Sequence, residues 1–267
     1  MAELDALRAP VLAIARSAGE AILAVYGEDF EVRHKADRSP VTDADMAAHR
    51  IIVDGLRALT PQWPVLSEES AAIPAAERRA WSRYWLVDPL DGTREFVKRN
   101  GEFTVNIALI DNARPVFGVL HAPALDETAS AVVGGSLEVT RNGMSVPRTL
   151  ARDRPPRIAG SRSHQDRRLD RALARLGEHT LVGIGSALKF IRVALGEVDL
   201  YVRLGSTSEW DTAAGQCLVE CVGGAVTDLA GVTLDYNRRD SVINPSFIAS
   251  ADRQLPWLER MALGESR

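Results

Sequence analysis

The segment Asp88 to Thr93, which reads Asp-Pro-Leu-Asp-Gly-Thr, has the residue types and spacing that point most directly to chemistry. It follows the apolar run 84–87, which is typical of a buried strand, so its carboxylates emerge at a strand end. Asp88 and Asp91 are three residues apart and can face one point, and hard divalent cations such as Mg²⁺ take oxygen ligands of this kind. Gly92 permits close approach to the backbone, where its amide and that of Thr93 can form an anion-binding nest. We therefore expect a site for a cation and a phosphate group here.

Two other interpretations of this segment were weighed against the metal site. Asp, Pro and Gly are ordinary turn residues, so a surface turn is one alternative. Haloacid-dehalogenase-type phosphatases carry a similar Asp-x-Asp-Gly-Thr pattern, in which the first aspartate is a covalent nucleophile. Here Pro89 stands two residues before Asp91, and Asp88 stands three before it. Because the spacing differs by one residue, a covalent aspartyl-phosphate is disfavoured.

Two further acidic positions strengthen the metal interpretation. Glu68 and Glu69 follow the short apolar run 65–66, which we expect to be a strand. Asp211 lies in the first turn of the helix that we expect over 211–222, where an aspartate usually complements the helix dipole. A Glu-Glu pair is most often part of a solvated loop, so neither position identifies a site by itself.

In combination, these segments resemble the signature of the inositol monophosphatase superfamily: Glu68, then 88–93, then Trp-Asp-Thr-Ala-Ala-Gly at 210–215. Five other tracts resemble the bacterial 3′(2′),5′-bisphosphate nucleotidases of that superfamily, namely 39–42, 66–69, 96–106, 161–164 and 185–190. The resemblance covers nearly the whole chain. It implies a layered α-β-α-β-α sugar-phosphatase fold. It also implies a Mg²⁺-dependent enzyme that removes the 3′-phosphate of adenosine 3′,5′-bisphosphate, a by-product of sulfate assimilation, to leave AMP.

The resemblance also implies which residues hold the metal. Glu68, Asp88 and the carbonyl of Leu90 would hold one Mg²⁺, and Asp88, Asp91 and Asp211 would hold a second. A third ion near Glu68, bound largely through water, occurs in the family. Four carboxylates would repel one another in an empty site, so a cation is needed for all of them to remain ionised.

Catalysis would depend on Asp45 and Thr93 as the dyad that orients and deprotonates the attacking water, with Glu68 also counted among the catalytic residues. The choice of Asp45 over the neighbouring Asp43 rests on the Thr-x-x-Asp spacing from Thr42. The implied reaction is direct attack of water with inversion at phosphorus and no phosphoenzyme.

The residues implied in substrate binding come from both halves of the chain. They are Glu68, Leu90, Asp91, Gly92, Thr93, His164, Ser186, Lys189, Arg203 and Asp211. A 5′-phosphate requires a cation, which Lys189 or Arg203 can supply. Taken alone, a helical lysine is usually solvated and a histidine such as His164 usually lies in a loop.

The lysines draw attention because the chain has 32 basic residues and only three of them are lysines: Lys35, Lys98 and Lys189. Lys35 lies near the expected dyad helix and Lys98 follows the phosphate-binding motif, but neither receives a role. Residues 141–175 contain ten arginines and three aspartates, hence a net charge of +7. This stretch lacks interleaved aromatic residues, so no nucleic acid polymer is expected as a partner.

The elements that must position these residues follow from periodicity. We expect helices over 4–26 and from Thr42 to about 59, the first kinked or restarted by Pro10 and the second opened by Thr42 and Asp45 as a capping pair. Strands are expected near 103–111, 115–122, 127–133 and 136–140. After a proline-rich boundary, strands and helices alternate to about residue 222, which favours helices that cover a mostly parallel or mixed sheet. The sequence thus predicts an α/β (α+β) protein, with an N-terminal subdomain 1–150 that carries the metal site and a C-terminal subdomain 151–267 that carries nucleotide specificity.

Composition excludes several classes of protein. The chain has 267 residues, a formal net charge of −4, 46% hydrophobic and 25% charged residues, which is ordinary for a soluble enzyme and unlike a disordered chain. The longest apolar runs are strand-sized, so no transmembrane segment is expected, and the acidic N-terminus is unlike a signal peptide. We expect a cytoplasmic protein. Association with the inner face of a membrane and a homodimeric state both stay open.

Three functional hypotheses remain at this stage. The favoured one is the bisphosphate nucleotidase. The nearest alternative is an enzyme of the same superfamily that acts on inositol phosphate or fructose 1,6-bisphosphate, against which the tracts around His164, Ser186 and Lys189 argue. The third is a catalytically silent phosphate-binding protein. The presence of all the acidic ligands and of Thr93 argues against a catalytically inactive protein.

Overall fold

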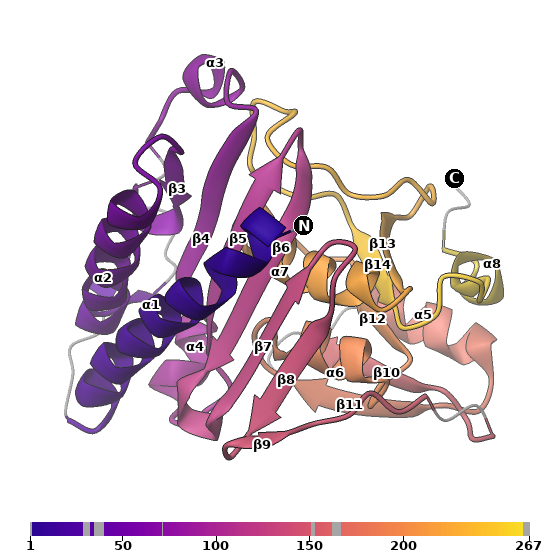
Figure 1. Cartoon of the computed structure of the whole chain (residues 1–267). Coiled ribbons are helices and arrows are strands. Elements are labelled where there is room, and N and C mark those ends of the chain that lie inside the picture. The colour runs from indigo at the N-terminus through magenta and orange to yellow at the C-terminus, as the bar shows by residue number, and fades with distance from the viewer. Residues whose placement is uncertain are drawn as a thin grey trace.

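Two β-sheets with a helical layer between them form the centre of the protein (Figure 1). The computed structural model describes residues 2–28, 33–34, 40–70, 72–150, 153–161 and 167–263. The first sheet has seven strands in chain order, β3 to β9, and the second has five in the order β11-β10-β12-β14-β13. A short ribbon pairs β1 with β2.

The strands of the first sheet are β3 Val65–Ser67, β4 Arg83–Asp91, β5 Thr104–Asp111, β6 Arg114–Ala122, β7 Glu127–Val132, β8 Leu137–Arg141 and β9 Met144–Ser145. The strands of the second sheet and of the ribbon are β10 Arg157–Ser161, β11 Thr180–Ile184, β12 Leu200–Arg203, β13 Ala225–Asp228, β14 Phe247–Ser250, β1 Arg33–His34 and β2 Pro40–Val41. In the first sheet only β3 and β4 are parallel neighbours, whereas β10 is parallel to both β11 and β12.

The α-helices are α1 Ala2–Tyr26, α2 Asp43–Leu59, α3 Ala75–Arg78, α4 Thr93–Val97, α5 Arg167–Leu176, α6 Leu188–Leu195, α7 Glu209–Cys221 and α8 Trp257–Met261. Two 3₁₀ turns complete the described elements, η1 Glu68–Ser70 and η2 Pro123–Leu125.

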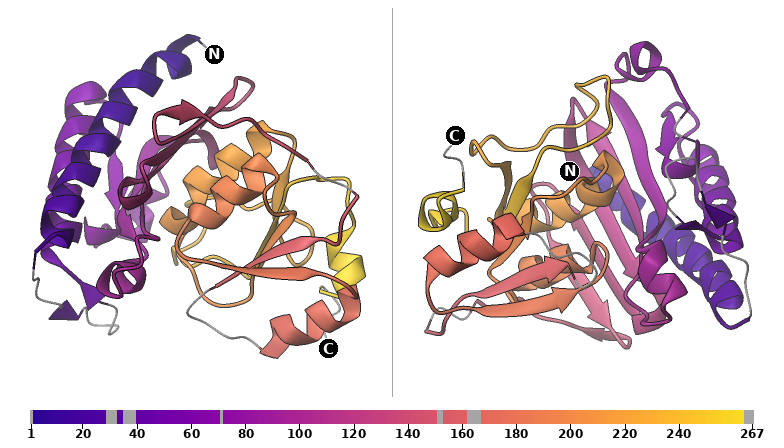
Figure 2. Two further views of the ribbon diagram at one scale, coloured as in Figure 1. Left: turned by 90° about the horizontal axis from the view of Figure 1, so that it is seen from below. Right: turned by 180° about the vertical axis from the view of Figure 1, so that it is seen from behind.

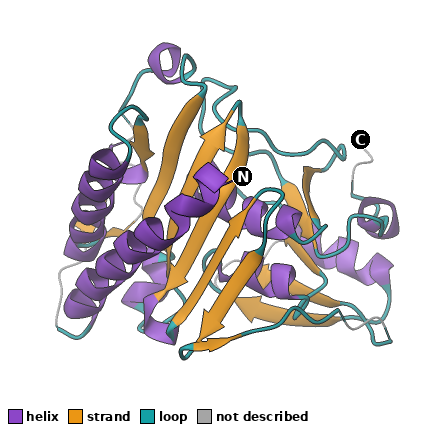
Figure 3. Ribbon diagram, in the orientation of Figure 1, coloured by secondary structure: helices purple, strands orange, loops and turns teal. Residues whose placement is uncertain are grey.

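The helices and sheets stack in five layers (Figures 2 and 3). Helices α1 and α2 cover the outer face of the first sheet, α6 and α7 lie between the two sheets, and α5 and α8 pack against the far side of the second. Three apolar clusters fill the boundaries between layers: one lies under α1 and α2, one surrounds the central helices and contacts both sheets, and one lies under α5 and α8. The predicted α-β-α-β-α architecture is therefore confirmed.

The helix α2 begins as the sequence predicts. The Thr42 side chain accepts a hydrogen bond from the Ala44 amide at 3.2 Å, and the Asp45 carboxylate accepts one from the Thr42 amide at 2.7 Å. This capping box satisfies amides that the first turn leaves without helical partners. It also determines which way Asp45 faces.

A buried ionic network joins α6 to the first sheet. Glu127 of β7 is fully buried, and its two carboxylate oxygens accept hydrogen bonds from Arg192 of α6, both at 2.6 Å. Arg141 of β8 donates to the same carboxylate at 2.8 Å. Since α6 follows the loop that lines the site described below, this network fixes that loop at one end.

Some features differ from the sequence prediction. Helix α1 runs without interruption through Pro10 instead of restarting there. Thr93 begins a short helix, α4, that the sequence reasoning treated as part of a turn. The strands β13 and β14 and the helix α8 had no predicted counterpart, because four- or five-residue elements carry too little periodicity. The predicted division near residue 150 lies between β9 and β10 and stays a prediction.

One helix within the described residues, α1, is long and apolar enough by length and composition to cross a membrane. Its buried residues, among them Val11, Ala15 and Ile22, belong to the apolar cluster shared with α2 and the first sheet. That packing accounts for its apolar face. The predicted absence of a transmembrane segment stays a prediction.

Candidate active site

The two aspartates of the Asp88–Thr93 segment lie at the end of β4, as predicted. Asp88 is 2% exposed, and Asp91 is the last residue of the strand. The pairing of β4 with β5 shifts register between these two positions, and such an irregularity re-aims side chains at a strand end. Gly92 follows with φ 91°, a left-handed conformation that favours glycine, and Thr93 then starts α4.

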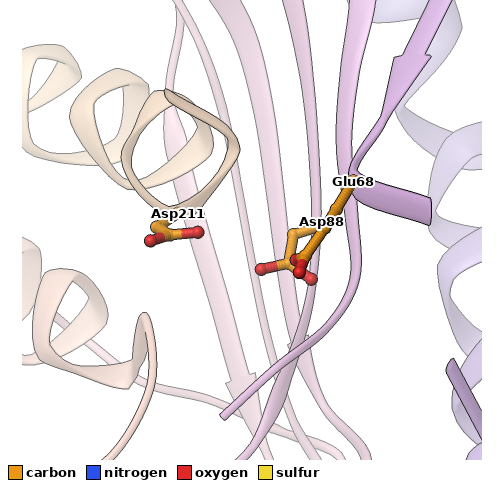
Figure 4. Close-up of side chains that lie close together, drawn as sticks. All are labelled: Glu68, Asp88 and Asp211. Atoms are coloured by element: carbon orange, nitrogen blue, oxygen red, sulfur yellow. The ribbon is translucent and has the colours of Figure 1, made fainter. Parts of the chain in front are cut away.

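A cluster of three carboxylates lies at this strand end. Glu68 comes from the turn η1 directly after β3, the parallel neighbour of β4, and Asp211 comes from the first turn of α7 across the site (Figure 4). One carboxylate oxygen from each of Glu68, Asp88 and Asp211 lies within 4.8 Å of the others. The structure thus brings together residues from three elements.

Asp211 has two roles that the sequence reasoning treated as alternatives. Its Oδ2 accepts a hydrogen bond from the Ser208 amide at 2.9 Å, and the two residues form a capping box at the start of α7. The same side chain belongs to the acidic cluster. The helix cap therefore holds the carboxylate in the site.

The carboxylates of the cluster lie close together and repel one another. Burial raises the pKa of Asp88 well above its usual value, and the neighbouring charges of Glu68, Asp91 and Asp211 raise it further. Burial likewise raises the pKa of Asp211, with Asp91 and Glu68 adding to the effect. Three carboxylate oxygens this close together, two of them on aspartates whose pKa values burial raises, suit a hard divalent cation. The described residues thus fit a metal ion.

Asp91 stands slightly apart from that trio. Burial raises the pKa of its carboxyl to about 6, while Lys189 and a hydrogen bond from the Ala187 amide oppose the rise. Asp91 therefore connects the end of β4 to the loop that precedes α6.

The two members of the predicted dyad, Asp45 and Thr93, lie close together, and their catalytic role stays a prediction. Asp45 is 2% exposed, whereas Asp43 is exposed, so the geometry favours Asp45 as the partner of Thr93. The Thr93 hydroxyl lies 3.4 Å from Asp45 Oδ1 and 3.4 Å from the Leu90 carbonyl oxygen. Both Thr42 donors, its amide and its hydroxyl, bind the other oxygen, Oδ2, of Asp45. This leaves Oδ1 directed toward Thr93.

A cavity of 540 Å³ opens beside these groups, and both sheets contribute to its walls. The first sheet contributes Leu90 and Gly92 in addition to the residues described above. The loop after β11 contributes Ser186, α6 contributes Lys189, and β12 of the second sheet contributes Arg203, three of the predicted substrate-binding residues. This volume is within the usual range for sites that take small molecules.

Lys189 is buried, unlike the solvated side chain that is usual for a lysine on a helix. It is 6% exposed, and its Nζ donates to the Ile184 carbonyl at 3.1 Å and to the Ser186 carbonyl at 2.6 Å. Burial lowers the pKa of Lys189 to about 8, an effect that nearby carboxylates such as Asp91 oppose. The ammonium also lies 5.2 Å from the centre of the Tyr201 ring.

The remaining predicted contacts divide into those the structure places and those it does not describe. Arg203 ends β12 at the cavity and donates to the Ser206 carbonyl at 2.9 Å. His164 and Lys35 lie outside the described residues. Lys98 is exposed at the end of α4 and does not line the cavity.

Tyr201 and Glu95 are among the residues that line the cavity but were not predicted from the sequence. Tyr201 lies two residues before Arg203, and the period of a strand places both on one face of β12. Glu95, 7% exposed, lies in the first turn of α4 beside the phosphate-binding motif. The two-residue spacing was a usable signal for Tyr201, whereas Glu95 becomes recognisable only once Thr93 is known to start a helix.

Comparisons with known proteins agree with this geometry. The model of the inositol monophosphatase family matches residues 3–258. The 3′(2′),5′-bisphosphate nucleotidase CysQ of Escherichia coli is 51% identical over 243 residues, which cover 90% of this chain and 98% of that protein.

Solved structures show the same relationship. The crystal structure of CysQ from Bacteroides thetaiotaomicron, a bacterial member of the inositol monophosphatase family, matches with a TM-score of 0.80 and 39% identity, covering 91% of this chain and 96% of that one. The extragenic suppressor protein suhB of Bartonella henselae matches with a TM-score of 0.79 and 28% identity, covering 98% and 99%. The predicted resemblance is confirmed: this chain belongs to the inositol monophosphatase family, and it is a phosphatase.

Proposed function

We propose that this phosphatase hydrolyses the 3′-phosphate of adenosine 3′,5′-bisphosphate and releases AMP and phosphate. The observation that carries the proposal is the cavity, which has a carboxylate cluster on one side and Lys189 and Arg203 on the other. A substrate with two phosphates matches these two regions. The 51% identity to a bisphosphate nucleotidase over nearly its full length supports the same choice. The proposed role is removal of this by-product of sulfate assimilation in the cytoplasm.

We further propose Mg²⁺ as the cofactor, with two or three ions per site. Glu68, Asp88, Asp91, Asp211 and the Leu90 carbonyl are the proposed ligands. When bound, Mg²⁺ would supply positive charge to the phosphoryl oxygens and lower the pKa of a water molecule. The raised pKa values of Asp88 and Asp211 support this assignment, since a cation would favour their ionised forms.

The chain's own residues would position the reactants. The Thr93 hydroxyl, which lies 3.4 Å from both Asp45 Oδ1 and the Leu90 carbonyl oxygen, would accept the proton of the attacking water while its own proton passes to Asp45. The amides of Gly92 and Thr93 would bind the departing phosphate. Attack by water itself requires no phosphoenzyme, and the configuration at phosphorus inverts.

Phosphate release tests the proposal directly. Release from adenosine 3′,5′-bisphosphate, inositol 1-phosphate and fructose 1,6-bisphosphate is compared with Mg²⁺, with chelator and with Li⁺, an inhibitor typical of the family. We expect the nucleotide to be preferred, chelation to abolish release, and Li⁺ to inhibit it. A preference for inositol 1-phosphate would overturn the substrate assignment and favour the alternative within the family.

Three variants and one control test the proposed roles of individual residues. Asp88→Asn should abolish Mg²⁺-dependent release and leave the protein folded. Asp45→Asn should also lose activity, and Asp43→Asn is its matched control, since Asp43 is exposed two residues away. Lys189→Ala should weaken binding of the bisphosphate far more than that of a sugar monophosphate, and equal losses would refute its role toward the second phosphate.

A further inference from the structure

We infer that Glu102 is a positioning residue, which holds the loop 184–187 of the second sheet against the phosphate-binding turn of the first. The loop connects β11 to α6 and forms one wall of the cavity through Gly185 and Ser186. The inference rests on the proposed function only in placing the substrate in this cavity. Nothing in the sequence motifs assigns a role to Glu102.

The direct contact is a hydrogen bond between residues 83 positions apart. Glu102 lies just before β5, and its Oε2 accepts a hydrogen bond from the Gly185 amide at 2.7 Å. This distance is at the short end of the range for hydrogen bonds from N–H to oxygen. This bond therefore ties the backbone of the loop to the edge of the first sheet.

The packing at this contact leaves no room for a side chain at position 185. A Cβ built on Gly185 would lie 2.7 Å from the Cγ of Glu95 and 2.8 Å from both the Cβ and the carbonyl oxygen of Glu102. The backbone of the loop thus lies directly on these two glutamates. Any movement of Glu102 would be transmitted to Gly185.

The loop needs external support because of its own conformation. Ser186 has φ 43°, in the left-handed region that residues with side chains rarely adopt. Lys189 binds the carbonyls of Ile184 and Ser186, and the Ala187 amide binds the carboxylate of Asp91. Together with Glu102, these charged side chains hold the loop from α6 and from the first sheet, and a sparsely populated backbone conformation persists only where several such contacts hold it.

The loop reaches the turn expected to bind phosphate. A Cβ built on Gly92 would lie 3.0 Å from the Ser186 Cβ and 3.1 Å from the Glu102 carbonyl oxygen. Glu102 and Ser186 therefore both abut the residue whose amide is expected to contact the departing phosphate. A displaced loop would change the binding wall and leave the carboxylate cluster and Thr93 where they are.

A second role for Glu102 must be distinguished from this one. Glu102 is also one of the carboxylates that favour the charged form of Lys189, so it could act as a counter-charge alone. The two roles require different properties of the side chain. Positioning requires an acceptor oxygen at full reach, whereas a counter-charge requires a negative charge at roughly the same place.

Three variants separate the roles. Glu102→Gln keeps the length and an acceptor oxygen but removes the charge, Glu102→Asp keeps the charge but is shorter by one methylene, and Glu102→Ala removes both. Glu178→Ala is the matched control, since Glu178 is exposed beyond the opposite end of β11. If Glu102→Ala fails to fold, the Gln and Asp variants still decide.

The first measurement is hydrogen–deuterium exchange of a peptide that covers residues 184–189, in protein without metal or substrate. We expect protection of the Gly185 amide to fall about tenfold or more in Glu102→Asp and Glu102→Ala, and to stay within about threefold of the wild type in Glu102→Gln and Glu178→Ala. Protection in Glu102→Asp with loss in Glu102→Gln would overturn the inference, and so would wild-type exchange in all three Glu102 variants.

The second measurement is steady-state hydrolysis of whichever of the three candidate substrates the wild type hydrolyses fastest. We expect KM to rise about tenfold in Glu102→Asp and Glu102→Ala, with kcat within about twofold of the wild type. In Glu102→Gln we expect both constants to be close to those of the wild type. A fall in kcat at constant KM would overturn the positioning role. Failure of the wild type to hydrolyse adenosine 3′,5′-bisphosphate would overturn the proposed function alone, because exchange is measured without substrate.

Discussion

Neutralising Asp91 is expected to stabilise the metal-free protein at neutral and alkaline pH. Burial, together with Glu68, raises the pKa of this carboxyl from 3.8 to about 6, despite the opposing effects of Lys189 and the Ala187 amide. A difference of this size between the folded and unfolded states corresponds to about 3 kcal/mol. Because the folded-state pKa is the higher one, this stability is present below pH 4 and is lost as the pH rises through about 6. The side chain in Asp91→Asn is neutral at every pH, so this variant keeps that stability as the pH rises.

Thermal unfolding in the presence of chelator measures the effect. At pH 8 we expect Asp91→Asn to unfold about 6–12 °C above the wild type, and at pH 4.5 the difference in stability should shrink to about a third. Asp170→Asn, which removes an exposed carboxylate on α5, is the control and should show no such dependence on pH. Adding Mg²⁺ should stabilise the wild type more than Asp91→Asn.

Two results would refute this reasoning. If Asp91→Asn is less stable than the wild type at pH 8 in chelator, the ionised carboxylate of Asp91 does not destabilise the metal-free protein. If the difference between the two proteins is the same at both pH values, the effect of the substitution does not come from titration of Asp91.

Two other predictions concern the dyad and the ionic network. Thr93→Val should lower kcat by about a hundredfold or more with an unchanged melting temperature, because its methyl group cannot relay a proton to Asp45, and Thr93→Ser should restore activity. Burial opposes ionisation of Glu127, but Arg192 and Arg141 outweigh it and lower its pKa. Glu127→Gln should therefore lower the free energy of unfolding by about 3 kcal/mol at pH 7, as measured in urea, and this deficit should shrink as the pH falls below 4.5. An unchanged stability, or a deficit that grows in acid, would contradict that assignment.

The parts of the site that could be predicted from sequence are those whose residues are close together in the chain. Asp88, Asp91, Gly92 and Thr93 lie in one short segment, so a strand followed by a turn is enough to bring them together. The capping box of Thr42 was predictable for the same reason, since it depends on a spacing of three residues. Long strands such as β5 and β6 were predicted to within one residue, because nine or so alternating or apolar residues give a clear pattern.

The parts that could not be predicted depend on contacts between distant segments. The sequence suggests that Lys189 reaches a phosphate, but not that its ammonium binds the carbonyls of Ile184 and Ser186. The ring of Tyr201, from β12, also lies next to this ammonium. The bond between Glu102 and Gly185 joins two sheets, and no local pattern in the sequence encodes it.

The position of α7 has a consequence for how activity arises during folding. The helix packs across β5, β6 and β7 of the first sheet, yet it also contacts β13 and β14 of the second, and it delivers Asp211 to a cluster whose other members come from β4 and η1. Local contacts can form β4 and its turn early, but closing the long loop to α7 is entropically costly and comes late. Until α7 has docked, the chain therefore lacks Asp211, and with it both the complete carboxylate cluster and this residue's share of the mutual repulsion. The repulsion that Asp211 adds and the capacity to catalyse therefore arise in the same late step of folding. A divalent cation present at that step would offset the repulsion and favour completion of the fold.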